Sequence, residues 1–200
     1  MAFMKSHTTD PATWDAIRAA IDAAHAADPV VENGQPAELV YADRVEAWMP
    51  KLLPEGECDP FARIAGRCQH LERWAIPRDS YPMDRPGYLR WRRDLGARQG
   101  ERAAQLAGEA GLDDDSCAYL QRLASKRCKS SDPIAQAMED AACLVFLQHQ
   151  APHFASKHSE EKIIDILQKT WKKMSPRGRE LALQCDLHPA VADLVGKALG

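Results

Sequence analysis

The chain has 200 residues and a formal net charge of −3, and 45% of its residues are hydrophobic and 28% charged. This length suits one large domain, and this composition excludes a disordered chain. The small negative charge excludes a protein whose whole surface binds nucleic acid, although a local basic patch is compatible with it. No two of the six cysteines form a CxxC pair, which argues against a zinc ribbon or a thioredoxin-type site.

No segment predicts secretion or membrane insertion. The first ten residues contain no apolar run, and the longest such run, 141–147, is far too short to cross a bilayer. We therefore expect a cytoplasmic protein without a membrane partner.

Helical periodicity dominates the chain, and no convincing alternating strand is present. Aspartate precedes proline at 10–11, 59–60 and 132–133, which marks helix starts, because the carboxylate accepts first-turn N–H groups and proline fits the first helical position. Apolar stripes predict helices over 11–27, from 36, over 60–74, 88–110 and 113–128, from 133, over 160–174, and from 176 and 189. The expected fold is an all-α, single-domain orthogonal bundle of about seven to nine helices over residues 1–200.

A charged residue lies on the apolar face of the third predicted helix. At 100° per residue, Glu72 shares a face with Phe61, Ile64 and Leu71. A buried carboxylate must be paired, protonated or metal-bound. A salt bridge to an arginine and a site role are equally favoured for Glu72, and the simplest interpretation of His70 is an arginine-flanked surface histidine.

The pair Glu139-Asp140 stands directly before the all-apolar stretch 141–147, which predicts a helix in the middle of the bundle. The two carboxylates point about 100° apart, so one can face a ligand while the other binds an arginine or lysine. We favour a functional role over a structural ion pair, because neutral packing would be more stable there. The ion-pair alternative has Arg63, Arg67 or Arg73 as its partner.

Residues 76–93 form a segment rich in prolines, aromatics and arginines. Prolines stiffen it, so that Arg78 and Arg85, with Tyr81 and Tyr88, could be held ready for an anionic ligand. Arginines at a helix start oppose the helix dipole, which suggests that they have partners. A rigid structural loop, fixed by salt bridges, is an equally favoured alternative.

Two further features have simple structural interpretations. Lysines in the run 169–174 end a helix, where they favour the dipole, and phosphate binding is the less favoured alternative. His149 and His153 have the spacing of metal ligands, but Pro152 disturbs the helix between them, and a solvated helix end is expected.

Four segments resemble the signature blocks of the family called domain of unknown function 4202, namely 69–78, 81–92, 138–147 and 166–175. The resemblance covers nearly the whole chain and implies no assigned activity. Gln99-Gly100 stands where the family is expected to have histidine and alanine, so this chain lacks one polar site group there.

A weaker, partial likeness is to the HD superfamily of helical metal-dependent phosphohydrolases. Residues 41–45, 65–74 and 139–140 are similar in place to its three ligand segments. Only His70 and Asp140 carry over, because Tyr41 and Leu71 stand where ligands belong. The likeness implies an HD-like bundle with a divalent transition metal at His70 and Asp140, although two ligands would hold a metal poorly.

Two hypotheses follow. The first is an HD-like hydrolase acting on a small phosphorylated or anionic substrate, with metal ligands or acid–base groups drawn from His70, Glu72, Glu139 and Asp140. Its substrate-binding residues would be Arg73, Arg78, Arg85, Tyr88 and Trp91. The second is a non-catalytic module that binds RNA, a nucleotide or a protein through residues 76–93. A di-iron protein ranks last, because the paired Glu-x-x-His motifs are missing.

Overall fold

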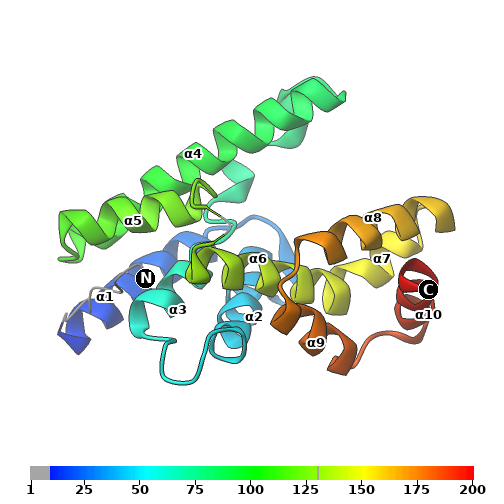
Figure 1. The fold of residues 1–200 in the computed structure, drawn as a ribbon. Coiled ribbons are helices and arrows are strands. Elements are labelled where there is room, and N and C mark those ends of the chain that lie inside the picture. The colour runs from blue at the N-terminus through cyan, green and yellow to red at the C-terminus, as the bar shows by residue number, and fades with distance from the viewer. Residues whose placement is uncertain (1–9, 130) are drawn as a thin grey trace.

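The computed structural model describes residues 10–129 and 131–200. The described helices, shown in Figure 1, are α1 (Pro11–Ala26), α2 (Ala37–Leu52), α3 (Pro60–Arg67), α4 (Arg85–Glu109), α5 (Asp114–Ala124), α6 (Pro133–Val145), α7 (Ala151–Ala155), α8 (Glu160–Lys173), α9 (Pro176–Gln184) and α10 (Pro189–Leu199). Three short turns of other helix types are η1 (Arg73–Ala75), η2 (Arg78–Ser80) and η3 (Phe146–Gln150). The all-α prediction is confirmed, and the ten α-helices slightly exceed the expected number. Residues 1–9, on which the expectation of no signal peptide rests, lie outside the described part.

The helix starts follow the capping chemistry in the sequence. Asp59 accepts the N–H of Ala62 at 2.8 Å, and Asp132 accepts that of Ala135 at 3.0 Å, each with proline as the next residue. Asp84 caps α4 in the same way, so this helix begins three residues before the predicted start at Tyr88. The carboxylates satisfy donors that would otherwise lack partners.

Helix α6 lies at the centre of the bundle, in contact with α2, α3, α8 and α9. Helix α4 packs along α5, and its first half extends beyond α5 in Figure 1. A continuous apolar core runs from Trp14 through Phe61 and Ala141 to Leu167. The centre of α6 is buried as its all-apolar sequence predicts.

Three local features differ from the sequence prediction. The third helix ends at Arg67 rather than Trp74, and the chain then turns through left-handed conformations at His70 (φ 63°) and Glu72 (φ 47°). A small antiparallel hairpin joins β1 (Val31–Glu32) to β2 (Gln35–Pro36) through Asn33-Gly34. Beyond α6, the π-turn η3 leads into Pro152, whose missing N–H interrupts the regular ladder. In the described part of the chain, every helix is too short or too polar to cross a membrane.

Candidate anion-binding cleft

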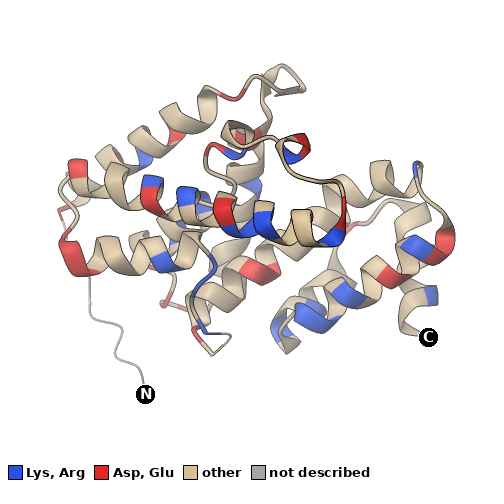
Figure 2. Ribbon diagram, turned by 90° about the horizontal axis from the view of Figure 1, so that it is seen from above, with Lys and Arg blue, Asp and Glu red and all other residues tan. Residues whose placement is uncertain are grey.

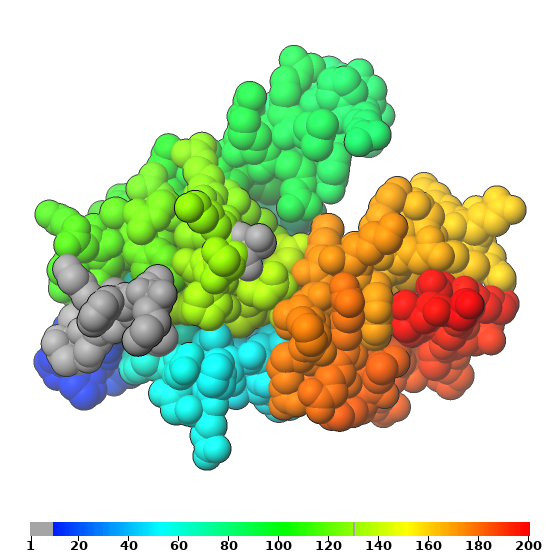
Figure 3. All heavy atoms as spheres, viewed as in Figure 1, coloured from blue at the N-terminus to red at the C-terminus, as the bar shows by residue number. Residues whose placement is uncertain are grey.

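A cavity of about 580 Å³ opens between the end of α5, the start of α6 and the end of α8. In Figure 3 the segments that border the cavity are the yellow-green residues of α5 and α6 and the orange end of α8. The cavity is lined by Leu123, Lys126, Cys128, Lys129, Ala135, Gln136, Met138, Glu139, Lys172, Lys173 and Met174. Four of these side chains are lysines and one is a glutamate, so the lining has a surplus of positive charge.

Glu139 is the only carboxylate of the lining, and it faces two of the lysines. Its oxygens lie 3.2 Å from Nζ of Lys126 and 3.5 Å from Nζ of Lys173. Burial acts to raise the pKa of Glu139, but Lys126 and Lys173 outweigh it and hold this pKa below its ordinary value. Lys129 and Lys172 form no ion pair within residues 10–129 and 131–200. The lining can therefore accept further negative charge.

Lys126 is held in an unfavourable backbone conformation. Helix α5 ends with a Schellman motif, in which Arg127 N–H donates to the carbonyl of Arg122 at 2.8 Å and Lys126 N–H donates to that of Leu123 at 3.0 Å. The motif needs a left-handed residue, and Lys126 supplies it with φ 57°. Helix α4 ends with the same motif but has Gly111 there, as the sequence predicted. A lysine in place of glycine at this position stores backbone strain beside the cavity.

A second polar group lies near the cleft, around His70. Its ring stacks on Tyr41 with centroids 4.1 Å apart, and Nδ1 lies 3.2 Å from Oε2 of Glu38. Nη1 of Arg73 lies 3.2 Å from Nε2 of His70. An arginine can only donate, so Nε2 accepts and Nδ1 carries the hydrogen that Glu38 accepts. This tautomer leaves a lone pair on Nε2, as a general base requires.

The protonation of this group is set mainly by burial. Burial raises the pKa of Glu38 to about 7, against the opposing attraction of Arg73. Burial also lowers the pKa of His70 well below its ordinary value, and Arg73, Lys126 and Arg92 lower it further. Lys126 and Arg92 also act on Glu139, which shows that the lysine-lined cavity and the His70 group share one electrostatic environment.

Asp140 does not share the role of Glu139 in the cavity. Its carboxylate instead fixes the start of α9. Its oxygens accept hydrogen bonds from the N–H of Ser175 at 2.9 Å, the hydroxyl of Ser175 at 2.5 Å and the amide of Gln136 at 3.1 Å. The two adjacent carboxylates do diverge, as expected, but Glu139 is the one that faces both lysines and cavity. The arginine partners suggested for this pair are not the ones it has.

Glu72 forms ion pairs with arginines. Its oxygens lie 3.0 Å from Nη2 of Arg98 and 2.9 Å from Nε of Arg102, both on α4. The salt-bridge alternative therefore describes its contacts, although Glu72 lies in a left-handed turn and not on a helix face.

The segment 76–93 is partly a structural clamp. Arg78 donates to the carbonyls of Tyr81 and Pro82 at 3.1 and 2.8 Å, and the indole of Trp91 donates to that of Ile76 at 2.8 Å. Trp91 is buried, whereas Arg85 and Tyr88 are exposed on α4. Of the predicted substrate-binding residues, Trp91 is therefore a buried structural support, whereas Arg85 and Tyr88 lie on the surface.

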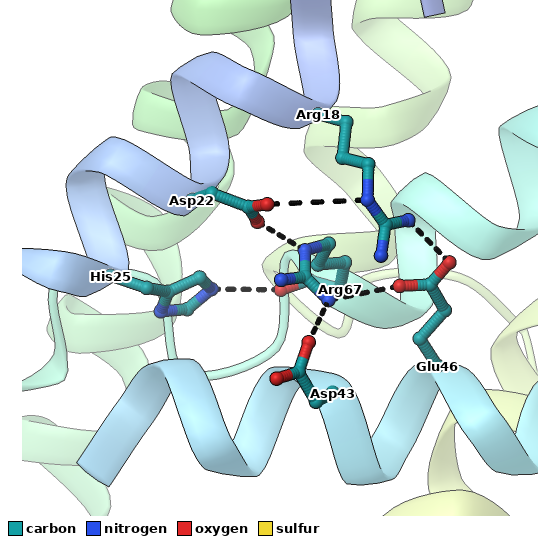
Figure 4. Close-up of polar contacts among 6 residues, drawn as sticks. All are labelled: Arg18, Asp22, His25, Asp43, Glu46 and Arg67. Carbon is teal, nitrogen blue, oxygen red and sulfur yellow. Dashed lines mark hydrogen bonds and ion pairs between the residues drawn. The ribbon is translucent and has the colours of Figure 1, made fainter. Parts of the chain in front are cut away.

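The structure also contains a buried ion cluster that the sequence did not reveal (Figure 4). The guanidinium of Arg67, only 2% exposed, binds Asp22, lies 2.7 Å from Asp43 and lies 2.9 Å from Glu46. Nε2 of His25 donates to the carbonyl of Arg67 at 2.9 Å. These contacts join α1, α2 and α3, and because the charges satisfy one another we assign the cluster a structural role.

Within residues 10–129 and 131–200, no group of three or more His, Cys, Asp and Glu side chains is arranged to hold a metal ion. His149 and His153 are both exposed, as expected for a helix end. His70 faces Glu38 and Arg73, while both oxygens of Asp140 bind Ser175.

These features define an all-α protein with a cation-lined cleft and a partly buried Glu38–His70 pair. Residues 15–195 match the model of a domain of unknown function, DUF4202, and the chain therefore belongs to that family. No curated protein and no solved structure matches the chain, so the HD likeness gains no support from these comparisons.

Proposed function

We propose that the protein binds a small phosphorylated ligand in the lysine-lined cleft. The observation that carries this proposal is the lining itself, in which four lysines surround a single glutamate in about 580 Å³. The four lysines are exposed around one cavity, where their mutual repulsion is unfavourable and a bound polyanion would relieve it. A volume of this size suits a ligand of metabolite or nucleotide dimensions.

The backbone supports the same conclusion. The strained residues Lys126 and His70 both lie at the cleft or beside it. Strain of this kind persists where the surrounding structure requires a particular side chain, and it clusters at binding sites. In Figure 2, blue bands mark the last turn of α8, which contributes Lys172 and Lys173 to the lining.

Inorganic pyrophosphate is the probe that tests the proposal most directly. Calorimetry at low salt should detect binding, and the double variant Lys172→Ala/Lys173→Ala should weaken it by at least tenfold, because a charge-assisted hydrogen bond contributes about 1.5–3 kcal/mol. The matched control is Lys162→Ala/Lys169→Ala, which removes two lysines of the same helix outside the lining. Equal affinity in the two double variants, or no binding by the wild type, would refute the proposal.

Hydrolysis of a phosphorylated substrate is a second candidate, favoured by the Glu38–His70 pair. In this scheme Nε2 of His70 accepts a proton from water, the water oxygen bonds to phosphorus as the ester P–O bond breaks, and the imidazolium returns the proton to the departing alkoxide, which leaves as the alcohol. Arg73 occupies Nε2 in the free protein, and a substrate phosphate that attracts Arg73 would free it.

Release of p-nitrophenol from p-nitrophenyl phosphate and its diester tests this candidate, with and without added divalent transition metals. His70→Gln should abolish turnover and leave pyrophosphate binding largely intact. Metal analysis of the purified protein tests the metal predicted at His70 and Asp140. Turnover that survives His70→Gln would exclude His70 as the base.

A further inference from the structure

The first half of α4 presents an exposed face of arginines, here called the outer arginine face. It comprises Arg85, Leu89, Arg90, Arg92 and Arg93, with Tyr88 at its edge. At 100° per residue, Leu89 and Arg93 lie opposite the buried Trp91, whereas Arg85, Arg90 and Arg92 lie about 100–120° from it, on its two flanks. The helix therefore packs on the protein by one side and directs its arginines outwards.

Most of these arginines lack a carboxylate partner. In the described part of the chain, Arg85, Arg90 and Arg92 form no ion pair, and Arg93 pairs with the exposed Asp94. Arg92 bonds instead to the hydroxyl of Tyr88 at 3.3 Å. Cations in the first turns of a helix oppose its dipole, each at a cost of about 0.3–1 kcal/mol. Unpaired arginines there are best explained by an anionic partner.

The position of the face leaves it accessible. Figures 1 and 3 show that the first half of α4 projects beyond α5 and the helices around α6. Leu89 is 57% exposed and Met83 76% exposed, and blue bands cluster on this half of the helix in Figure 2. A convex, projecting helix offers no groove to a folded partner, but a flexible strand can lie along it.

We infer that the outer arginine face binds single-stranded nucleic acid without strict sequence preference. Guanidinium groups bind phosphate in a bidentate manner, and bases stack on exposed tyrosine rings and on guanidinium planes. Arg85 and Arg92 are seven residues apart, or roughly 10 Å along the helix, which spans about three phosphates of a stacked strand. The net charge of −3 means that attraction must come from this face and not from the whole surface.

The number of arginines predicts the salt dependence. Three phosphate contacts on a single strand give a slope of about −2 in a plot of log K against log salt concentration. This binding site is separate from the proposed cleft, so neither result decides the other.

The test uses fluorescence anisotropy of the whole chain with a labelled 12-nucleotide single-stranded RNA lacking a terminal phosphate. Arg85→Glu/Arg90→Glu should weaken binding at least tenfold. Arg63→Glu/Lys157→Glu, which reverses two exposed cations elsewhere, and Lys172→Ala/Lys173→Ala in the cleft should each change it less than threefold. Circular dichroism melting confirms that every variant is folded.

Three outcomes would overturn the inference. They are no RNA binding at 50 mM salt, an equal loss of affinity in both charge-reversal variants, and equally tight binding of an acidic peptide. The last result would assign the face to an acidic protein instead.

Discussion

Replacement of Lys126 by glycine should separate the strain at the cleft from its charge. Lys126 occupies the left-handed position of the Schellman motif that ends α5, with φ 57°. Glycine relieves about 1 kcal/mol of backbone strain there. Both Lys126→Gly and Lys126→Ala lose the ion pair with Glu139 at 3.2 Å, which is partly exposed and contributes up to about 1 kcal/mol. Only the glycine variant gains the relief.

We therefore expect Lys126→Gly to melt about 2–4 °C above Lys126→Ala, because 1 kcal/mol shifts the melting temperature by that amount in a chain of this size. Both variants should bind pyrophosphate about equally weakly, since both lack the ammonium group. Thermal unfolding and calorimetry on the same samples measure the two effects. An alanine variant as stable as the glycine variant would show that the turn stores no strain, and retained affinity in either would remove Lys126 from the site.

The remaining predictions concern buried charges. In the folded chain Glu38 keeps its proton up to about pH 7, but its ordinary pKa is 4.5, so its contribution to stability is lost as the pH rises between these values. Glu38→Gln should therefore stabilise the protein by about 3 kcal/mol at pH 8 and by under about 1 kcal/mol at pH 5, measured by urea unfolding; an equal effect at both pH values would contradict the raised pKa. Arg67→Met removes the cation shared by Asp22, Asp43 and Glu46, of which Glu46 keeps its ion pair with Arg18 at 2.5 Å, and should lower the free energy of unfolding by about 3 kcal/mol; a loss below about 1 kcal/mol would mean that the cluster is not stabilising. Asp140→Ala removes the acceptor of the Ser175 N–H and hydroxyl groups and should lower the free energy of unfolding by about 3 kcal/mol. The control Asp165→Ala, on the surface of α8, should change the free energy of unfolding by under about 1 kcal/mol.

Helix starts could be predicted because their chemistry is local. An aspartate followed by proline satisfies the first-turn donors wherever the helix lies, and α1, α3 and α6 begin at such pairs. The end of α3 could not be predicted, because no glycine or proline marks it and the turn at His70 depends on tertiary contacts with Glu38 and Tyr41. The hairpin did have a local signal in Asn33-Gly34, which favours a two-residue turn but has only two paired residues on each side.

Some residues of the candidate site could likewise be predicted from the sequence, and others could not. Glu139 could be identified because it stands directly before the apolar stretch of α6, and its neighbour Asp140 does point elsewhere. The periodicity of 60–74 predicts that Arg67 lies on the polar side of its helix, away from Phe61 and Ile64, but α3 packs on several sides and this arginine is 2% exposed. Periodicity assumes one buried face, so it fails for a short helix enclosed by its neighbours. Lys126 and Lys172 lie 46 residues apart, and nothing in either segment reveals that they line one cavity.

The tight contact beneath α9 has a consequence for the cleft. A Cβ atom on Gly178 would lie 2.6 Å from Cγ of Asp140, so any larger residue must push that carboxylate away from Ser175. Ser175 follows two residues after Lys173, so the end of α8 that carries the lysines is held in place through Gly178, a residue outside the cavity lining. A change at position 178 would loosen this anchor and alter anion affinity from outside the cavity, whereas a change at Glu139 would retune the charge and leave the anchor in place.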